Sequence, residues 1–232
     1  MWYKLKRIMM RPNGVEKQVR PSWWKPWANC IAYFPFIDDK SNTISGSNIS
    51  ISNSNIWITT LGGVECLELD WVSTQTLNIG FTVANITSVM CWVNSWNDFW
   101  YLISERSTVW GDQSRWLWLY YNQMHVNRYQ NAGWDLDYSF NFGTWWNCVG
   151  YTEDSNWWKL FLNGNLSPVS SNNNTRHFNI LTNNVWIFCN NNNGTLQDPG
   201  KWYASKLVLM DAPITIDDFL DFYNQTKSDY WL

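Results

Sequence analysis

Short strand-like segments follow one another along almost the whole of this 232-residue chain, and polar turns separate them. From residue 28 onward they recur about every ten residues, with no helical pattern between them. Aromatic and β-branched residues favour strands, and the abundant Asn favours turns. This succession predicts an all-β fold, a jelly-roll β-sandwich built from two packed sheets.

The expected strands cover residues 30–36, 48–52, 56–61, 65–71, 77–81, 88–96, 99–106, 115–122, 123–130, 136–140, 146–154, 157–165, 178–182, 184–190 and 205–210. One short C-terminal helix is expected near residues 215–225. Thr215 suits its N-cap, and Asp217 and Asp218 suit the positive end of the helix dipole.

The stretch "NWWKLFLNGNL" combines a strand with the pair Asn163-Gly164. Both residues accept a positive φ easily, which predicts a type I′ turn. Alternation places Trp158, Leu160 and Leu162 on one face of the strand, and this face should be core. The aromatics here are therefore expected to be mostly structural.

Residues 1–27 differ from the rest of the chain. "YKLKRIMM" and "VEKQVRP" predict two short strands around "RPNG", and Pro21 and Pro26 mark a boundary. Seven basic residues against Glu16 give the first 25 residues a charge of +6. Because the whole chain has a net charge of −3, the rest of the chain carries −9. We expect a basic hairpin over residues 1–27, which is either a docking arm for a protein partner or a solvated terminus, and one domain over residues 28–232.

The charge and hydropathy patterns narrow the choice of partners. An acidic body argues against nucleic acid, because duplex binding requires a basic face. No segment approaches the ~20 apolar residues of a membrane span, and the N-terminus lacks the pattern of a secretory signal. The five cysteines have neither zinc-site nor disulfide-scaffold spacing, so we expect small buried hydrophobes.

Several segments occur in an order that resembles a known superfamily: "IAYFPFIDD", "LELDW", "SVMCWVNSW", "GTWWNCVGYTEDSNWWKLFLNGN" and "SKLVLMDAPITIDDFLDFYN". Over about residues 28–225 the chain is similar to the concanavalin A-like lectin/glucanase superfamily in its laminin-G-like form. The resemblance implies a jelly-roll sandwich that binds carbohydrate or protein partners, and some branches hydrolyse glycans. No cofactor is implied except calcium, for which Asp38 and Asp39 would be the candidate metal ligands. Ser205 stands near the position where many members have a second calcium-binding Asp.

Tryptophan is unusually common, with 20 Trp against 12 Gly. Trp71 and Trp231 stand where the superfamily pattern prefers Gly, and Trp cannot replace Gly at a positive φ without strain. One hypothesis is that the source genome reads UGA as Gly and that UGA was translated here as Trp. The codons of the gene decide this, because UGG at these positions would exclude it.

An enzymatic function would need paired carboxylates, as in retaining glycosidases. In "ECLELDWVS", Glu68 and Asp70 share one face, but Val72 and Ser73 stand where the second Glu of the glucanase motif belongs. His125 and His177 are isolated, and no nucleophile or metalloprotease motif occurs. We therefore predict a non-catalytic protein.

A binding function rests on aromatic residues of one strand. In "RWLWLYYN", Trp116, Trp118 and Tyr120 alternate with Leu117 and Leu119. If the Leu face is core, the aromatic face is free to stack on sugars. Alternatively, both faces are covered and the aromatics only pack. The candidate ligand-binding residues are Trp110, Asp112, Arg115, Trp116, Trp118, Tyr120, Arg128 and Asp135.

The sequence thus predicts a non-catalytic recognition module for carbohydrate or a host-surface glycan. A lectin-like domain behind a docking arm suits an extracellular or virion-surface protein, such as a phage tail component, and a cell-surface adhesin is the alternative. A structural or assembly protein without a glycan ligand is a further alternative, and a glycoside hydrolase with a degenerate carboxylate motif is another.

Overall fold

The structure is a computed structural model, and it describes residues 27, 29–36, 42–44, 57–69, 77–82, 86–95, 100–106, 114–120, 123–130, 133–141, 145–153, 157–173, 184–187, 190–192, 195–197 and 202–230. The predicted hairpin of residues 1–27, except Trp27, lies outside the described residues. The strands expected at 48–52 and 178–182 also lie outside them. In the six-stranded sheet, the structure describes the backbone pairing and the side chain of Leu102.

The larger sheet has eight antiparallel strands in the order β12-β11-β10-β5-β16-β3-β2, and β1 also pairs with β16. Their bounds are β1 Cys30–Phe34, β2 Trp57–Leu61, β3 Val64–Leu69, β5 Ser88–Ser95, β10 Asn147–Glu153, β11 Trp157–Leu162, β12 Ser170–Asn173 and β16 Trp202–Met210. The sheet therefore joins the two ends of the described chain, since β1 and β16 lie side by side.

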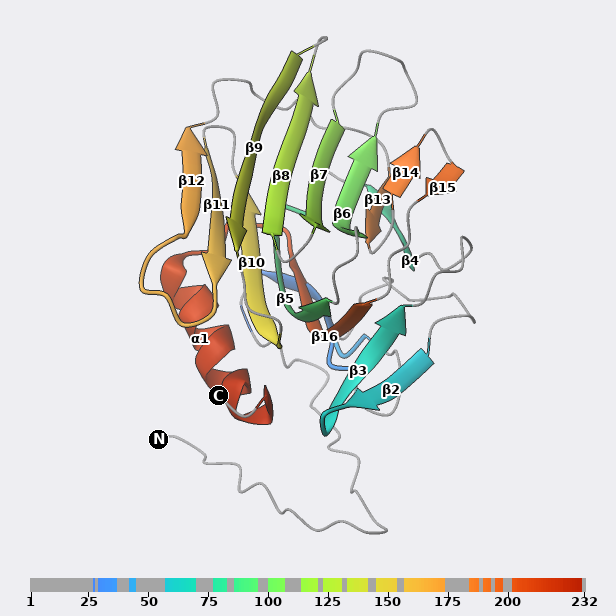
Figure 1. Ribbon diagram of the computed structural model, residues 1–232, viewed down its shortest axis with the longest axis vertical. Coiled ribbons are helices and arrows are strands. Elements are labelled where there is room, and N and C mark those ends of the chain that lie inside the picture. The colour runs from blue at the N-terminus through green and yellow to red at the C-terminus, as the bar shows by residue number, and fades with distance from the viewer. Residues whose placement is uncertain are drawn as a thin grey trace.

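The second sheet has six strands in the order β4-β13-β6-β7-β8-β9. Their bounds are β4 Leu77–Thr82, β6 Trp100–Arg106, β7 Ser114–Tyr120, β8 Gln123–Gln130, β9 Gly133–Asn141 and β13 Asn184–Ile187. A small third sheet pairs β14 Asn190–Asn192 with β15 Thr195–Gln197. Figure 1 shows the green strands β6, β7, β8 and β9 of this sheet in the upper part of the molecule and the red helix α1 (Ile216–Thr226) at the lower left.

The two main sheets share a hydrophobic core. Leu102 of β6 packs in one buried cluster with Leu67, Val89, Val149 and Leu160 of the larger sheet. Burial of such side chains contributes about 1.5–3 kcal/mol each. The predicted β-sandwich of jelly-roll type is confirmed, and β12, β14 and β15 are strands that the sequence did not indicate.

The opposite face of the larger sheet is covered by α1, Ile216–Thr226, and the following 3₁₀ helix η2, Lys227–Tyr230. Thr215 is the N-cap as predicted: its Oγ1 accepts from the Asp218 N–H at 3.2 Å, while its own N–H donates to Asp218 Oδ2 at 2.8 Å. Phe219 and Phe222 are the buried face of α1. The helix lies this close because Gly150 of β10 has no Cβ, which would stand 2.6 Å from Phe219 Cδ2.

The Asn163-Gly164 turn differs from the predicted type I′ geometry. Asn163 adopts φ +50°, whereas Gly164 is absent from the described positive-φ residues. Tertiary contacts decide this, because Asn163 Oδ1 accepts from the Cys148 N–H at 2.9 Å. Gly164 lies against Tyr223, whose ring would be 2.8 Å from an added Cβ. The expected core face of β11 is confirmed by buried Trp158 and Leu160.

The tryptophans of the described segments adopt ordinary backbone conformations, since none is among their positive-φ residues. Trp92, Trp146 and Trp158 are buried and fill the core. A glycine at these positions would leave large cavities. Trp71 and Trp231 lie outside the described residues.

Candidate functional site

Six of the eight predicted ligand-binding residues lie on neighbouring strands of the six-stranded sheet. Trp116, Trp118 and Tyr120 are alternate positions on β7, and the register pairs them with Asn127, His125 and Gln123 of β8. Alternate positions on a strand share one face of the sheet. The backbone therefore places the three aromatic positions in one stripe along β7, an inner strand of the sheet.

The polar candidates form a second group. Arg115 of β7 pairs with Arg128 of β8, which pairs with Asp135 of β9. Glu105 of β6 pairs with Arg115 and extends this line to four strands. Because Arg115 and Trp116 are adjacent in one strand, alternation puts the polar line and the aromatic stripe on opposite faces. Arg115 and Arg128 lie in the strands expected at 115–122 and 123–130, and Asp135, which was expected just before the strand at 136–140, lies on β9.

The remaining predicted site residues lie outside the described residues: Trp110, Asp112, and the metal candidates Asp38 and Asp39. Within the described segments, no group of three His, Cys, Asp or Glu residues could hold a metal ion. Ser205, near the expected second calcium position, instead donates from Oγ to the Glu65 carbonyl at 3.0 Å. Calcium binding therefore stays a prediction from the resemblance.

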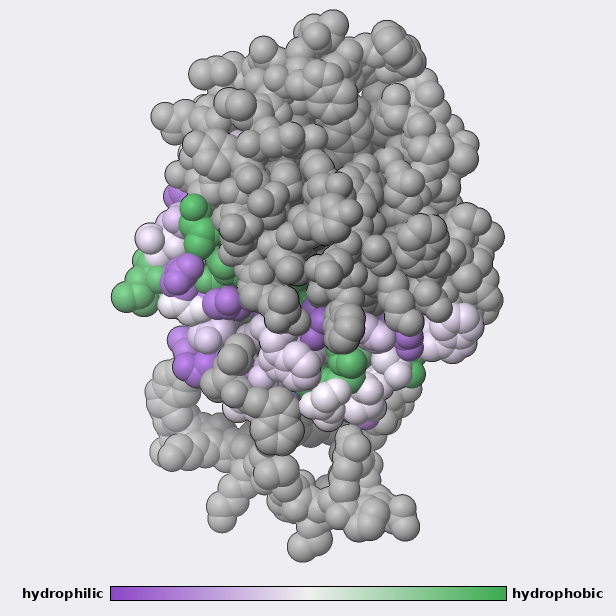
Figure 2. All heavy atoms as spheres, viewed as in Figure 1, coloured by the Kyte–Doolittle hydropathy of each residue, from purple (hydrophilic) through white to green (hydrophobic). Residues whose placement is uncertain are grey.

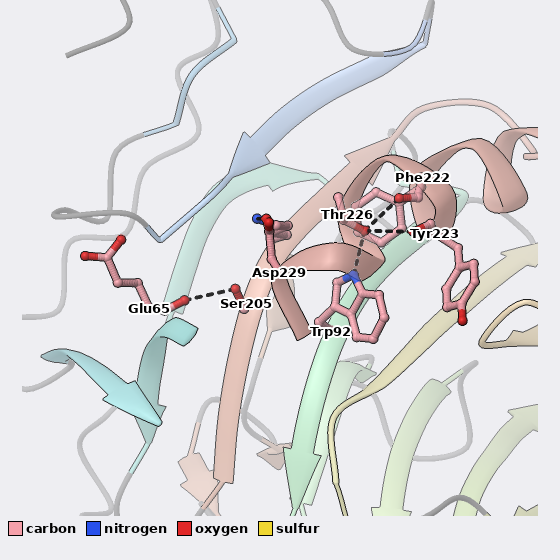
Figure 3. A network of polar contacts seen from close by, with 8 residues as sticks. Glu65, Trp92, Ser205, Phe222, Tyr223, Thr226 and Asp229 are labelled. Atoms are coloured by element: carbon pink, nitrogen blue, oxygen red, sulfur yellow. Dashed lines mark hydrogen bonds and ion pairs between the residues drawn. The ribbon is translucent and has the colours of Figure 1, made fainter. Parts of the chain in front are cut away.

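The helix-covered face of the larger sheet is an aromatic assembly with a structural role. Trp92 of β5 stacks on Tyr230 at 3.8 Å between ring centroids, and Tyr223 stacks at 5.7 Å. The Trp92 indole Nε1 donates to Thr226 Oγ1 at 2.8 Å, and the Thr226 hydroxyl donates to the Phe222 carbonyl at 2.7 Å. Figure 3 shows this network at the junction of helix and sheet. The polar atom of a large buried ring is thus satisfied inside the protein.

An ion pair ties η2 to the sheet beside this assembly. Lys206 has φ +55° at an irregularity of β16, and its Nζ lies 2.7 Å from Asp229 Oδ2. The Lys206 ammonium also lies 5.8 Å from the Tyr230 ring centroid. Burial raises the pKa of the Tyr230 hydroxyl well above its ordinary value. This corner of the molecule is therefore built for packing, and the raised pKa keeps the Tyr230 hydroxyl protonated near neutral pH.

The cysteines of the described segments behave as the sequence predicted. Cys30, Cys66, Cys91 and Cys148 are free and buried. Burial raises the pKa of the Cys66 thiol to about 12, and it raises those of Cys91 and Cys148 as well. Thiols of this kind are inert, because the thiolate is the reactive species. Cys189 lies outside the described residues.

Two of the three carboxylates of "ECLELDWVS", Glu65 and Glu68, lie within the described residues. Glu65 and Glu68 are three residues apart on β3, so they lie on opposite faces. Tyr203 of β16 is opposite Glu68 and its hydroxyl makes a long contact of 3.5 Å with Glu68 Oε1. Asp70 lies outside the described residues.

One buried polar side chain next to this pair was missed at the sequence level. Asn94 of β5 is opposite Tyr203, is fully buried, and has no hydrogen-bond partner for either side-chain atom. Its signal in the sequence was a lone amide inside the apolar run "VMCWVNSW".

Three large apolar residues of the described part are exposed, Trp57, Trp145 and Leu166. On the face in Figure 2, the coloured apolar residues form small patches between polar ones.

Comparison with family models finds no match, and comparison with curated proteins finds none either. Solved structures do match. The receptor-binding domain of botulinum neurotoxin D has a TM-score of 0.58 at 11% identity, covering 85% of this chain and 53% of that one. The binding domain of botulinum neurotoxin DC, described in complex with SialylT, has a TM-score of 0.60 at 10% identity, covering 85% and 52%.

A third match, for botulinum neurotoxin type C, is described by the dependence of cell entry on two ganglioside molecules; its TM-score is 0.58 at 10% identity, covering 85% of this chain and 51% of that one. At such identities the likeness shows the fold alone. The chain spans about half the length of the structures it matches. The fold thus defines a β-sandwich of the type found in receptor-binding domains. No described helix is long and apolar enough to cross a membrane.

Proposed function

We propose that this chain is a non-catalytic carbohydrate-recognition domain of the concanavalin A-like, laminin-G-like kind. The observation that carries the proposal is the likeness over 85% of the chain to receptor-binding domains, one of them in complex with SialylT. The matched structures are twice as long, so their ligands support a class of ligand for this chain and no particular site. In this proposal the chain is part of a phage tail or of a cell-surface protein, and it binds its ligand at an extracellular or virion surface.

The ligand is proposed to bind the six-stranded sheet around β7. Its register gives two lines of candidate residues on opposite faces of the sheet, the aromatic stripe of Trp116, Trp118 and Tyr120 and the polar line through Arg115 and Arg128, and one ligand can lie on only one of them. Aromatic faces stack on sugar rings, whereas guanidinium groups bind carboxylates in pairs of hydrogen bonds. Trp110 and Asp112, which precede β7 in the chain, stay further candidates, and so does Asp135, which pairs with Arg128 in the register.

The test uses the full chain on an array of sialylated glycans, followed by calorimetry with the strongest binder. Truncating a stacking ring costs on the order of 2 kcal/mol at a binding hot spot, which is about thirtyfold in affinity. We expect Trp118→Ala to lose affinity by this factor with an unchanged melting temperature. Trp145→Ala is the matched control, because Trp145 is an exposed tryptophan on another part of the molecule.

Two results would count against this site. If Trp118→Ala unfolds the domain, the aromatic stripe is core. If no sialylated glycan binds and pull-downs against host surfaces are also blank, the assembly alternative replaces recognition, with the basic arm of residues 1–27 as its docking segment. Release of reducing sugar from β-glucans would instead support the hydrolase alternative.

A further inference from the structure

Four residues form one line across the larger sheet, away from the β7 region. The register places Trp57 of β2 opposite Glu68 of β3, Glu68 opposite Tyr203 of β16, and Tyr203 opposite Asn94 of β5. Residues directly opposite one another in antiparallel strands point to the same face. We call this line the edge row; it lies on the face that carries α1, since Tyr203 packs against the same cluster as Phe219 and Phe222.

The two ends of the edge row differ in exposure. Asn94 is fully buried, Tyr203 and Glu68 are half-buried, and Trp57 is 53% exposed at the outer strand of the sheet. The row therefore has a covered inner end and an end open to solvent. A ligand that lies along it would meet an aromatic face first, then a carboxylate and a phenol, and finally the surroundings of an amide.

The amide at the inner end lacks any partner in the protein. Neither Asn94 Nδ2 nor Asn94 Oδ1 makes a hydrogen bond. Buried polar groups are almost always paired, and those without a protein partner are commonly satisfied by ordered water or a ligand. Leucine has nearly the same volume and would fill this position without an unpaired group. Asn94 thus lowers stability unless something binds near it.

The chemistry of the edge row fits a saccharide. A pyranose ring presents a C–H face that stacks on an indole, and its hydroxyls both donate and accept hydrogen bonds. Glu68 accepts, the Tyr203 hydroxyl donates or accepts, and the Asn94 amide does both. Glu68 is the only charged member of the row, so an anionic sugar would be repelled.

We propose that the edge row is a second carbohydrate site, which takes a neutral saccharide. Its ring stacks on Trp57, and its hydroxyls bind Glu68 and Tyr203. Because Asn94 is fully buried in the free protein, the half-buried Tyr203 opposite it must shift before a hydroxyl or a water can bind the amide. This site is separate from the β7 region and stands independently of the proposal made for that region.

The experiment uses the full chain on an array of neutral oligosaccharides that end in glucose, galactose, mannose or N-acetylglucosamine and carry no sialic acid or sulfate. The strongest binder is then measured by calorimetry. We expect Trp57→Ala and Glu68→Gln each to weaken binding by about tenfold or more. Trp145→Ala is the control that keeps the affinity within about twofold. Because the probes are neutral, a failure of sialylated glycans to bind leaves this result unaffected.

Asn94→Leu separates a binding role from a packing defect. We expect it to raise the melting temperature of the free protein, because an unpaired amide is removed, and to weaken oligosaccharide binding. If it raises the melting temperature while affinity stays unchanged, the inference is wrong. A blank neutral array, or Trp57→Ala binding as tightly as the unchanged chain, also overturns it. Should Asn94→Leu fail to fold, Trp57→Ala and Glu68→Gln decide the matter alone.

Discussion

Two neighbouring positions of β5 on the same face of the larger sheet differ in how their polar side-chain atoms are satisfied. We call the group around Trp92 the covered row, and the edge row that contains Asn94 is the open row. In one row, Trp92 is fully covered by Tyr230, and its indole N–H is bound by Thr226. Two residues further along β5, Asn94 is also buried but has no partner, and its row runs outward to exposed Trp57. The C-terminal helix therefore satisfies the polar atom of Trp92 and not that of Asn94, although the Tyr230 hydroxyl in the covered assembly is also buried without a partner.

The difference between the two rows separates aromatic residues that pack inside the protein from aromatic residues that are candidates for ligand contact. An aromatic residue whose polar atom is satisfied by its own fold is part of the packing. An exposed ring beside an unsatisfied polar group is a candidate for ligand contact. The substitutions below test whether the two rows differ in this way, from the largest expected effect to the smallest.

The largest effect is expected at the centre of the covered row. Trp92→Ala should reduce the free energy of unfolding by about 3–5 kcal/mol, because it opens a cavity under Tyr230 and Tyr223. Trp57→Ala, in the open row, should change it by less than about 0.5 kcal/mol. Urea unfolding followed by circular dichroism measures both. Equal losses at the two positions would mean that the rows do not differ.

A smaller effect is expected where the helix approaches the sheet most closely. In Gly150→Ala the new methyl group would lie 2.6 Å from Phe219 Cδ2 and 2.9 Å from Cε2. Overpacking of this kind costs about 1–3 kcal/mol. Unfolding free energies should show this loss, and the double variant Gly150→Ala, Phe219→Leu should recover part of it. Without recovery, the close approach of α1 to β10 is not the cause.

Thr226→Val removes the hydroxyl that completes the covered row and keeps the side chain's shape. The Trp92 indole N–H would then resemble the unpaired Asn94 amide, at a cost of about 1–2 kcal/mol in unfolding free energy. Thr60→Val, at an exposed position on β2, is the matched control and should change little. If both substitutions have the same effect in urea unfolding, the buried hydrogen bond contributes nothing special.

The smallest effect is expected at the start of α1. Thr215→Ala removes the side chain that accepts from the Asp218 N–H, and loss of an N-cap costs about 1 kcal/mol. The helix should still cover Trp92, so binding of neutral oligosaccharide at the edge row should not change. Thermal unfolding measures the loss, with exposed Ser228→Ala as the control. A change in affinity would show that the two rows are coupled through α1.

Local features of the sequence were sufficient for most of the fold. The capping residues Thr215 and Asp218 predicted where α1 begins, and alternation in "RWLWLYYN" predicted β7 within one or two residues. Such signals work because capping and strand alternation depend on neighbours within a few residues of the chain. The weak signals failed: β12 is the polar stretch "SSNN", which becomes a strand only because β11 offers it an edge.

The candidate sites depended on pairings that no local pattern contains. The sequence determined that the chain forms a β-sandwich with one C-terminal helix and which aromatic residues alternate along each strand. Only the tertiary structure decided that Gly164 lies under Tyr223, and that Trp57, Glu68, Tyr203 and Asn94 form one line. Strands far apart in the chain become neighbours when burial of both sheet faces selects one order of strands, and the register between them is fixed by packing across the whole sheet.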